Sequence, residues 1–137
     1  MLDANIVVRA VLGVRVRQLI ERYAGEVDLF APDVAFVEAE AYLPGLYAKR
    51  GLSAEPALAV CEQVSAIVQE LPLPFYLGQE SEARARIERR DPDDWPVLAC
   101  ALVLGCPVWT EDLDFFGTGV ATWTSDRVEL FLSQKTG

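Results

Sequence analysis

Acidic residues are grouped where a strand is expected to end or a helix to begin. The groups are Asp3, the pair Glu38 and Glu40, the group Asp91, Asp93 and Asp94, and the pair Asp112 and Asp114. In an open parallel sheet the carboxyl ends of the strands lie along one edge and face a common crevice. We therefore expect four acids from distant segments to meet there, namely Asp3, Glu38, Asp94 and Asp112.

A meeting of four carboxylates has an electrostatic consequence. Two carboxylates about 4 Å apart repel each other by roughly 4 kcal/mol at an effective dielectric of 20. The cluster is therefore unfavourable unless cations bind to it or some of the acids take up protons. Oxygen ligands suit Mg²⁺ or Mn²⁺, and such ions assist an in-line phosphoryl displacement. The pattern predicts metal-dependent hydrolysis of phosphodiester bonds.

Each of these acids also has a plainer explanation. Asp94 could cap its helix, Asp112 could turn the chain after a strand, and Glu38 could lie on a solvated face. With 21 acids in 137 residues, chance groupings are common. Asp3 is harder to explain in this way because it stands among apolar residues with Asn5 beside it.

The composition restricts the remaining possibilities. The length of 137 residues, with 52% hydrophobic and 24% charged residues, predicts a single globular domain. The sequence shows neither a membrane-length apolar run of roughly 20 residues nor a secretory signal, so the expected location is the cytoplasm. Because the chain has no histidine, Ser-His-Asp catalysis and an HExxH zinc site are excluded.

The net charge of −9 argues against binding nucleic acid through overall charge, and it suits a basic protein partner. Binding to nucleic acid would therefore need a local group of basic residues. Four arginines, Arg84, Arg86, Arg89 and Arg90, either hold substrate phosphates or pair with glutamates on a solvated helix, which is the favoured interpretation. We expect the three tryptophans to pack in the core and the three cysteines to be buried and reduced.

Apolar periodicity predicts alternating strands and helices, and hence an α/β fold with a mainly parallel sheet. A first strand ends near Asp3, and a helix with Val14, Leu19, Ile20 and Tyr23 on its inner face ends at Gly25. The remaining expected strands are 29–31, 73–77, 108–110 and 119–124, and the remaining expected helices are 33–50, 54–71, 80–90, 94–105 and 126–133.

Three segments together resemble a known family. The opening Leu2-Asp3-Ala4-Asn5-Ile6 is similar to the first strand and Asp-x-Asn signature of PIN domains, the fold of VapC-type toxins and related nucleases. The segment 94–101 resembles the third acid of that family and the small-residue helix after it. The segment 105–115 resembles the closing Gly, apolar strand and Thr-x-Asp-x-Asp-Phe, and Glu38 after Ala31-Pro32 fits the second acid.

The resemblance implies a single PIN-like domain over residues 1–137, with a three-layer α/β/α arrangement around a central, mainly parallel sheet. It implies a metal site of Asp3, Glu38, Asp94 and Asp112, with Asn5, Thr110 and Asp114 orienting the ligands or the substrate. Family members are typically Mg²⁺- or Mn²⁺-dependent ribonucleases that are often homodimeric, and many pair with a small antitoxin. Here only Met1 and Leu2 precede Asp3, so the first strand is either truncated or begins upstream.

Two functional hypotheses remain open. The first is a nuclease, more specifically a ribonuclease and the toxin of a toxin–antitoxin pair. The alternative is a PIN-like module that binds a protein partner and has weak or lost catalysis, which the short first strand and the acidic charge favour. A phosphate-accepting signalling domain fits less well, because it needs a lysine near the end of a late strand and the only late lysine is Lys135.

Overall fold

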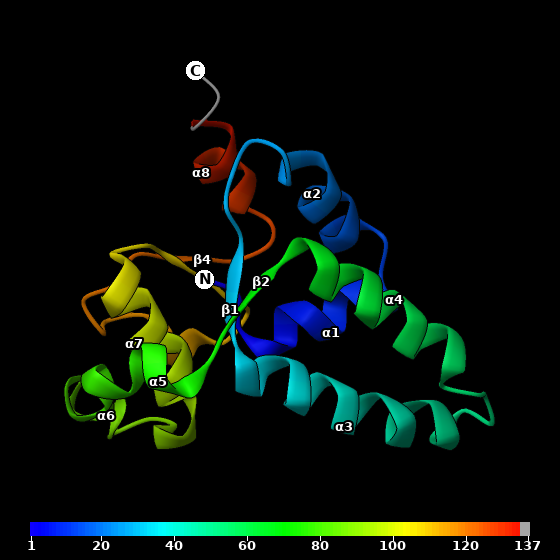
Figure 1. Ribbon diagram of the computed structural model, residues 1–137, viewed down its shortest axis with the longest axis horizontal. Helices are drawn as coiled ribbons and strands as arrows, with labels where there is room; N and C mark the ends of the chain where they lie inside the picture. The colour runs from blue at the N-terminus through cyan, green and yellow to red at the C-terminus, as the bar shows by residue number, and fades with distance from the viewer. Residues whose placement is uncertain (135–137) are drawn as a thin grey trace.

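Short strands and helices alternate along the chain, and the predicted α/β class is confirmed. The computed structural model describes residues 1–134 (Figure 1). The strands are β1 (Phe30–Pro32), β2 (Gln69–Leu71), β3 (Val108–Trp109) and β4 (Thr122–Trp123). The α-helices are α1 (Ala4–Leu12), α2 (Arg15–Tyr23), α3 (Asp33–Lys49), α4 (Glu55–Ile67), α5 (Leu73–Tyr76), α6 (Glu80–Ile87), α7 (Trp95–Leu104) and α8 (Val128–Gln134). The 3₁₀ turns are η1 (Leu77–Gln79), η2 (Pro92–Asp94) and η3 (Leu113–Phe115).

The strands pair in parallel as two two-stranded sheets, β1 with β2 and β3 with β4. The first residues of the chain lie between these sheets. Leu2 forms an isolated parallel bridge with Trp109, and its amide donates to the carbonyl of Phe30 at 2.7 Å. The extended segment before Asp3 is therefore hydrogen-bonded to β1 on one side and to β3 on the other.

Residues next to each other in the strand segments belong to different hydrophobic clusters. Leu2 and Trp109 pack with the residues of α1 to α4, whereas Met1 and Val108 pack with those of α5 to α7. This alternation is the two-residue period of extended chain with both faces covered. Figure 1 shows the two groups of helices on opposite sides of β1.

The first helical region is broken where the sequence predicted an inner face. Helix α1 ends at Leu12, and Gly13 is extended with φ −121° and ψ 178°. The chain restarts as α2 at Arg15, which leaves Val14 57% exposed and buries Val16 instead. The prediction of Val14 as a core residue was therefore wrong, because the break changes the phase of the helical period.

Two neighbouring elements also differ from the prediction. The expected helix 54–71 ends at Ile67, and 69–71 is the strand β2, whose Gln69 amide donates to the Leu29 carbonyl at 2.8 Å. The expected strand 73–77 is the short helix α5, with Pro74 in its first turn. Asp33 determines this outcome, because its carboxylate accepts the amide of Leu73 and the hydroxyl of Tyr76.

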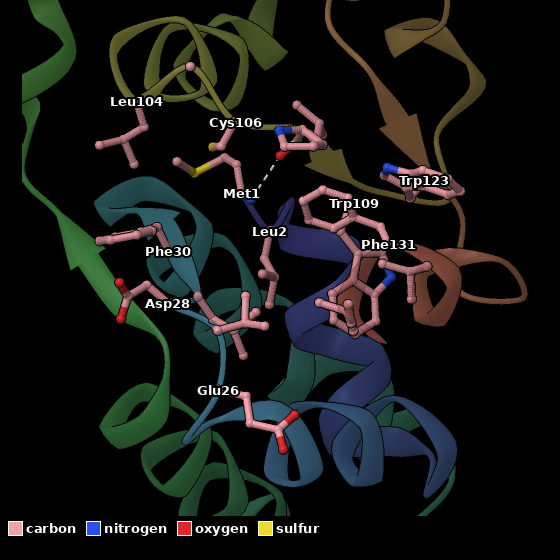
Figure 2. A pocket seen from close by; sticks show the side chains of 17 residues that line it. Met1, Leu2, Glu26, Asp28, Phe30, Leu104, Cys106, Trp109, Trp123 and Phe131 are labelled. Atoms are coloured by element: carbon pink, nitrogen blue, oxygen red, sulfur yellow. Dashed lines mark hydrogen bonds between the residues drawn. The ribbon is translucent and has the colours of Figure 1, made fainter. Parts of the chain in front are cut away.

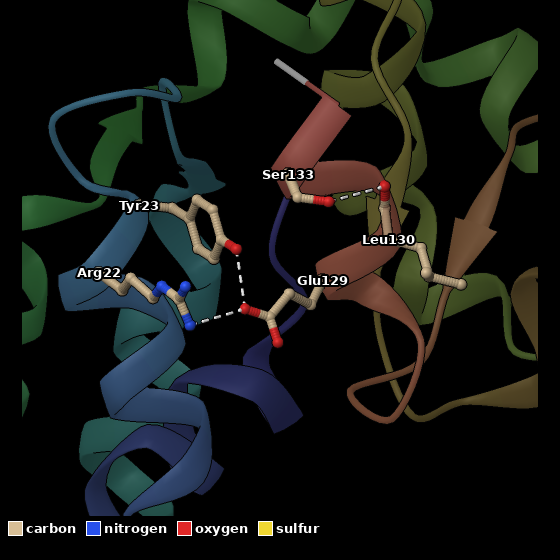
Figure 3. Close-up of polar contacts among 5 residues, drawn as sticks. All are labelled: Arg22, Tyr23, Glu129, Leu130 and Ser133. Carbon is tan, nitrogen blue, oxygen red and sulfur yellow. Dashed lines mark hydrogen bonds and ion pairs between the residues drawn. The ribbon is translucent and has the colours of Figure 1, made fainter. Parts of the chain in front are cut away.

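The closing helix is fastened to α2 by one carboxylate, as Figure 3 shows. Glu129 of α8 accepts a hydrogen bond from the Tyr23 hydroxyl at 2.7 Å and pairs with Arg22 at 3.2 Å. The hydrogen bond to Glu129 is the main reason that the pKa of Tyr23 is raised. Segments at the two ends of the described chain are held together in this way.

The cysteines are free, with Cys61 and Cys100 buried and Cys106 partly buried. Among the described residues, 1–134, no helix has the length and apolar character needed to cross a bilayer.

Candidate active site

Asp3 and Asp112 follow neighbouring parallel segments at the same edge. Asp3 comes directly after Leu2, which bridges Trp109, and its own amide donates to the Trp109 carbonyl at 3.1 Å. Asp112 follows β3 and caps η3, where its Oδ1 accepts the Asp114 amide at 2.9 Å. Because the two segments run in parallel, their carboxyl ends bring these two acids together.

A polar network holds Asp3 in place. Its Oδ1 accepts the amide of Ala4 at 2.7 Å, and its Oδ2 accepts the Thr110 hydroxyl at 2.8 Å and the Asn5 side-chain amide at 2.9 Å. Asn5 Oδ1 accepts the amide of Glu111 at 3.2 Å. The Thr110 hydroxyl in turn accepts the amide of Asp112 at 2.9 Å. Asn5 and Thr110 therefore link the two acids.

The carboxyl group of Asp3 is unusual because the residue is only 5% exposed. Burial raises the pKa of Asp3, and the negative charges of Asp112 and Asp91 raise it further. The hydrogen bonds from Thr110 and from the Ala4 amide act in the opposite direction and lower that pKa. The network therefore stabilises a buried carboxylate at this position.

Asp94 carries the largest perturbation of the four predicted ligands. Burial, followed by the charges of Asp3 and Asp91 and a hydrogen bond with Asp112, raises the pKa of Asp94 to about 8. Although Asp94 immediately precedes α7, its side chain makes no capping hydrogen bond there. The Asp94 carboxyl therefore does not cap α7, which was the plainer explanation of this residue.

Glu38 and Glu40 lie on α3 and have different neighbours. Partial burial of the Glu38 carboxyl and then the charge of Asp3 raise the pKa of Glu38. Glu40 instead lies near α4, where burial, followed by the charge of Glu40, raises the pKa of the Cys61 thiol. The structure therefore brings Glu38 towards Asp3 and directs Glu40 elsewhere.

Asp91 is a member of the cluster that the sequence analysis did not select. Its charge raises the pKa values of Asp3, Glu38 and Asp94, and its Oδ1 accepts the Asp93 amide at 3.1 Å. The signal available in the sequence was its place before Pro92 in a run of three aspartates. Asp114, by contrast, is tied in through its backbone amide to Asp112.

The donor set fits a hard divalent cation in its chemistry, because it consists of carboxylates that destabilise one another's charged forms. The carboxylates are spread more widely than the ligands of a formed metal site. Within residues 1–134, no three His, Cys, Asp or Glu side chains lie close enough together to hold an ion.

Two of the four arginines near the third acid pair with glutamates of the same helix. Arg84 pairs with Glu80 at 2.7 Å and lies over the ring of Trp95, and Arg86 pairs with Glu82 at 2.9 Å. These are the i to i+4 pairs that the sequence favoured. The tryptophans also pack within the protein, with Trp109 buried and Trp123 stacked on Phe131.

A pocket lies at the opposite ends of the strands (Figure 2). It has a volume of about 620 Å³ and is lined mainly by apolar residues, including Leu2, Phe30 and Trp109, with Glu26 and Asp28 as its acids. None of the clustered acids described above lines it. The pocket is therefore separate from the candidate active site.

An α/β protein with carboxylates gathered at the ends of parallel segments is the class that the fold and the site define. Comparison with protein families then gives the assignment. The model of the PIN domain matches residues 1–133, and the chain belongs to the PIN domain family. PIN domains are generally nucleases and typically use divalent metals. No curated protein and no solved structure matches the chain.

Proposed function

We propose that this PIN domain is a divalent-metal-dependent endoribonuclease. One observation carries the proposal: burial and the charges of neighbouring acids raise the pKa values of Asp3, Glu38 and Asp94, which come from distant segments, and that of Asp94 reaches about 8. A cation would relieve this repulsion, and a nuclease without histidine needs such an ion for its chemistry.

Asp3, Glu38, Asp94 and Asp112 are the residues that would hold Mg²⁺ or Mn²⁺. When bound, the ion supplies activation of water and stabilisation of negative charge on the phosphate oxygens. Thr110 and Asn5 hold Asp3 through its Oδ2, which keeps that carboxylate oriented. Burial and the charges of Asp3 and Asp91 raise the pKa of Asp94 to about 8, and a bound cation would favour its charged form. Hydrolysis would leave a 5′-phosphate and a 3′-hydroxyl.

We also propose a three-layer architecture and protein partners for this domain. The hydrogen bonds of Leu2 and Asp3 to both β1 and β3 support one central parallel sheet in a three-layer α/β/α fold. The net charge of −9 suits a basic partner, as expected for a toxin bound by a small antitoxin, and we propose a homodimer.

The test combines calorimetry with a cleavage assay. Wild-type protein should bind Mn²⁺ and cleave a labelled RNA oligonucleotide, and EDTA should stop cleavage. Asp94→Asn should abolish both binding and cleavage, whereas the matched control Glu40→Gln should retain both. Cleavage that persists in Asp94→Asn or in EDTA would show that the proposed mechanism is wrong.

A second candidate function is a protein-binding PIN module with weak or lost catalysis. The open arrangement of the carboxylates favours it, since no three metal-ligating side chains of residues 1–134 enclose an ion. Calorimetry separates the two candidates, because an intact nuclease site should bind Mn²⁺ in the absence of any partner. Absence of Mn²⁺ binding by the wild-type protein would favour this second function.

A further inference from the structure

Arg86 of α6 and Arg90, which lies three residues beyond the end of that helix, bind the backbone of the loop that follows Asp112. Nη1 of Arg90 donates to the carbonyl of Asp114 at 2.9 Å and also to that of Phe116. Nη1 of Arg86 donates to the carbonyl of Thr118 at 3.0 Å. Three carbonyls at alternate positions of the loop are thus bound by these two guanidinium groups.

Glycines make this close approach possible. Gly117 has φ +86°, and a Cβ there would lie 2.8 Å from Nη2 of Arg90. Gly119 has φ +85°, and a Cβ there would lie 2.8 Å from Nη1 of Arg86. A side chain at either position would displace a guanidinium in addition to straining the backbone. The same pairing of an arginine with a glycine occurs twice, which indicates a built contact.

The loop is connected directly to the acidic cluster. The Asp114 amide donates to Oδ1 of Asp112, while the Asp114 carbonyl accepts from Arg90. Phe115 in the same turn is fully buried in the cluster that contains Ile87 of α6. Helix α6 also leads into the segment with Asp94, so one helix supports two of the acid-bearing segments.

We propose that Arg86 and Arg90 are positioning residues of the active site, which clamp the 113–119 loop and thereby fix the carboxylate of Asp112. This inference rests on the proposed nuclease function. The clamp acts through backbone carbonyls that accept from a terminal nitrogen of each guanidinium, so its action depends on the reach and the fixed N–H directions of arginine rather than on positive charge alone.

The first experiment compares Arg90→Ala with the exposed neighbour Arg89→Ala. Hydrogen bonds from charged groups are worth about 1.5–3 kcal/mol, which corresponds to roughly tenfold to a hundredfold in an equilibrium constant. Arg90→Ala should weaken Mn²⁺ binding about tenfold and lower kcat, with KM for RNA nearly unchanged. Arg90→Lys should remain impaired, and Arg89→Ala should resemble the wild type. An increase in KM alone, or full rescue by lysine, would mean that Arg90 attracts substrate by charge and would overturn the proposal.

A second variant tests the clamp without removing a charge. Gly117→Ala should reproduce the effect of Arg90→Ala, because its Cβ displaces the guanidinium. Gly51→Ala is the matched control, since Gly51 also has positive φ (+67°) but no atom within 4 Å of an added Cβ. Equal Mn²⁺ affinities in Gly117→Ala and Gly51→Ala would contradict the clamp.

Hydrogen exchange gives a readout that is independent of catalysis. In Arg90→Ala the amides of 113–119 should exchange faster than in the wild type, whereas those of α1 should not change. If the wild type neither binds Mn²⁺ nor cleaves RNA, the proposed function fails, and this exchange difference still reports on the clamp. Unchanged exchange in the loop would overturn the clamp itself.

Discussion

The hydroxyl of Thr110 donates a 2.8 Å hydrogen bond to Oδ2 of Asp3, across 107 positions of sequence. Thr110 is fully buried, and its oxygen also accepts the amide of Asp112. One side chain therefore connects the acid at the end of the first extended segment with the acid that follows β3.

Replacement of Thr110 by valine should weaken both the fold and the site. Valine has a similar shape but leaves Asp3 without its strongest pKa-lowering hydrogen bond. We expect a loss of about 1–3 kcal/mol in the free energy of unfolding, together with weaker Mn²⁺ binding. Urea denaturation and calorimetry measure the two effects. Thr110→Ser keeps the hydroxyl and should recover most of both, and a valine variant with wild-type Mn²⁺ affinity would contradict this role.

The metal-free protein should lose stability as the pH rises from about 4 to 8. Because the pKa of Asp94 is raised to about 8 in the folded state, the folded protein binds more protons than the unfolded protein in that window. The contribution of Asp94 is complete below the unfolded pKa and is lost as the pH passes through the folded pKa. Urea unfolding in EDTA at several pH values tests this dependence. Asp94→Asn should flatten it, and an equally steep profile in that variant would assign the dependence to other groups.

Mn²⁺ should stabilise the folded protein, and the stabilisation should depend on Glu38 but not on Glu40. At free metal 100 times above Kd, linkage gives about 2.7 kcal/mol. Glu38→Gln should reduce the Mn²⁺-induced rise in Tm, because Glu38 is the member of the pair whose pKa responds to Asp3. Thermal unfolding with and without Mn²⁺ measures this rise. If Glu40→Gln reduced it as much as Glu38→Gln, the second ligand would be wrongly assigned.

Tyr76→Phe should destabilise the fold while leaving metal binding unchanged. The buried Tyr76 hydroxyl donates to Asp33, which also accepts the amide of Leu73, so the pair fastens α5 to the start of α3. Loss of this hydrogen bond should cost about 1 kcal/mol or more. Urea denaturation gives the change in stability, and calorimetry with Mn²⁺ gives the affinity. A large loss of Mn²⁺ affinity would show that the site depends on this distant contact.

The sequence by itself determined the elements whose signals are local. The apolar run of α7 stops at Gly105, which has φ +62°, the left-handed conformation typical of a glycine helix end. The positions of Asp3 after an apolar start and of Asp112 after β3 were also readable, because each acid follows its strand directly. The family resemblance over the opening and closing segments is confirmed by the match to residues 1–133.

Tertiary structure decided what depends on partners far away in the chain. Residues 69–71 continue the apolar spacing of a helix, yet they form β2 because the Gln69 amide pairs with Leu29. Local spacing likewise does not predict that Asp91 lies near Asp3 or that Arg90 binds the 113–119 loop. Periodicity reports which face of a segment is buried, whereas hydrogen bonds and charges between distant segments arise only when the chain has folded.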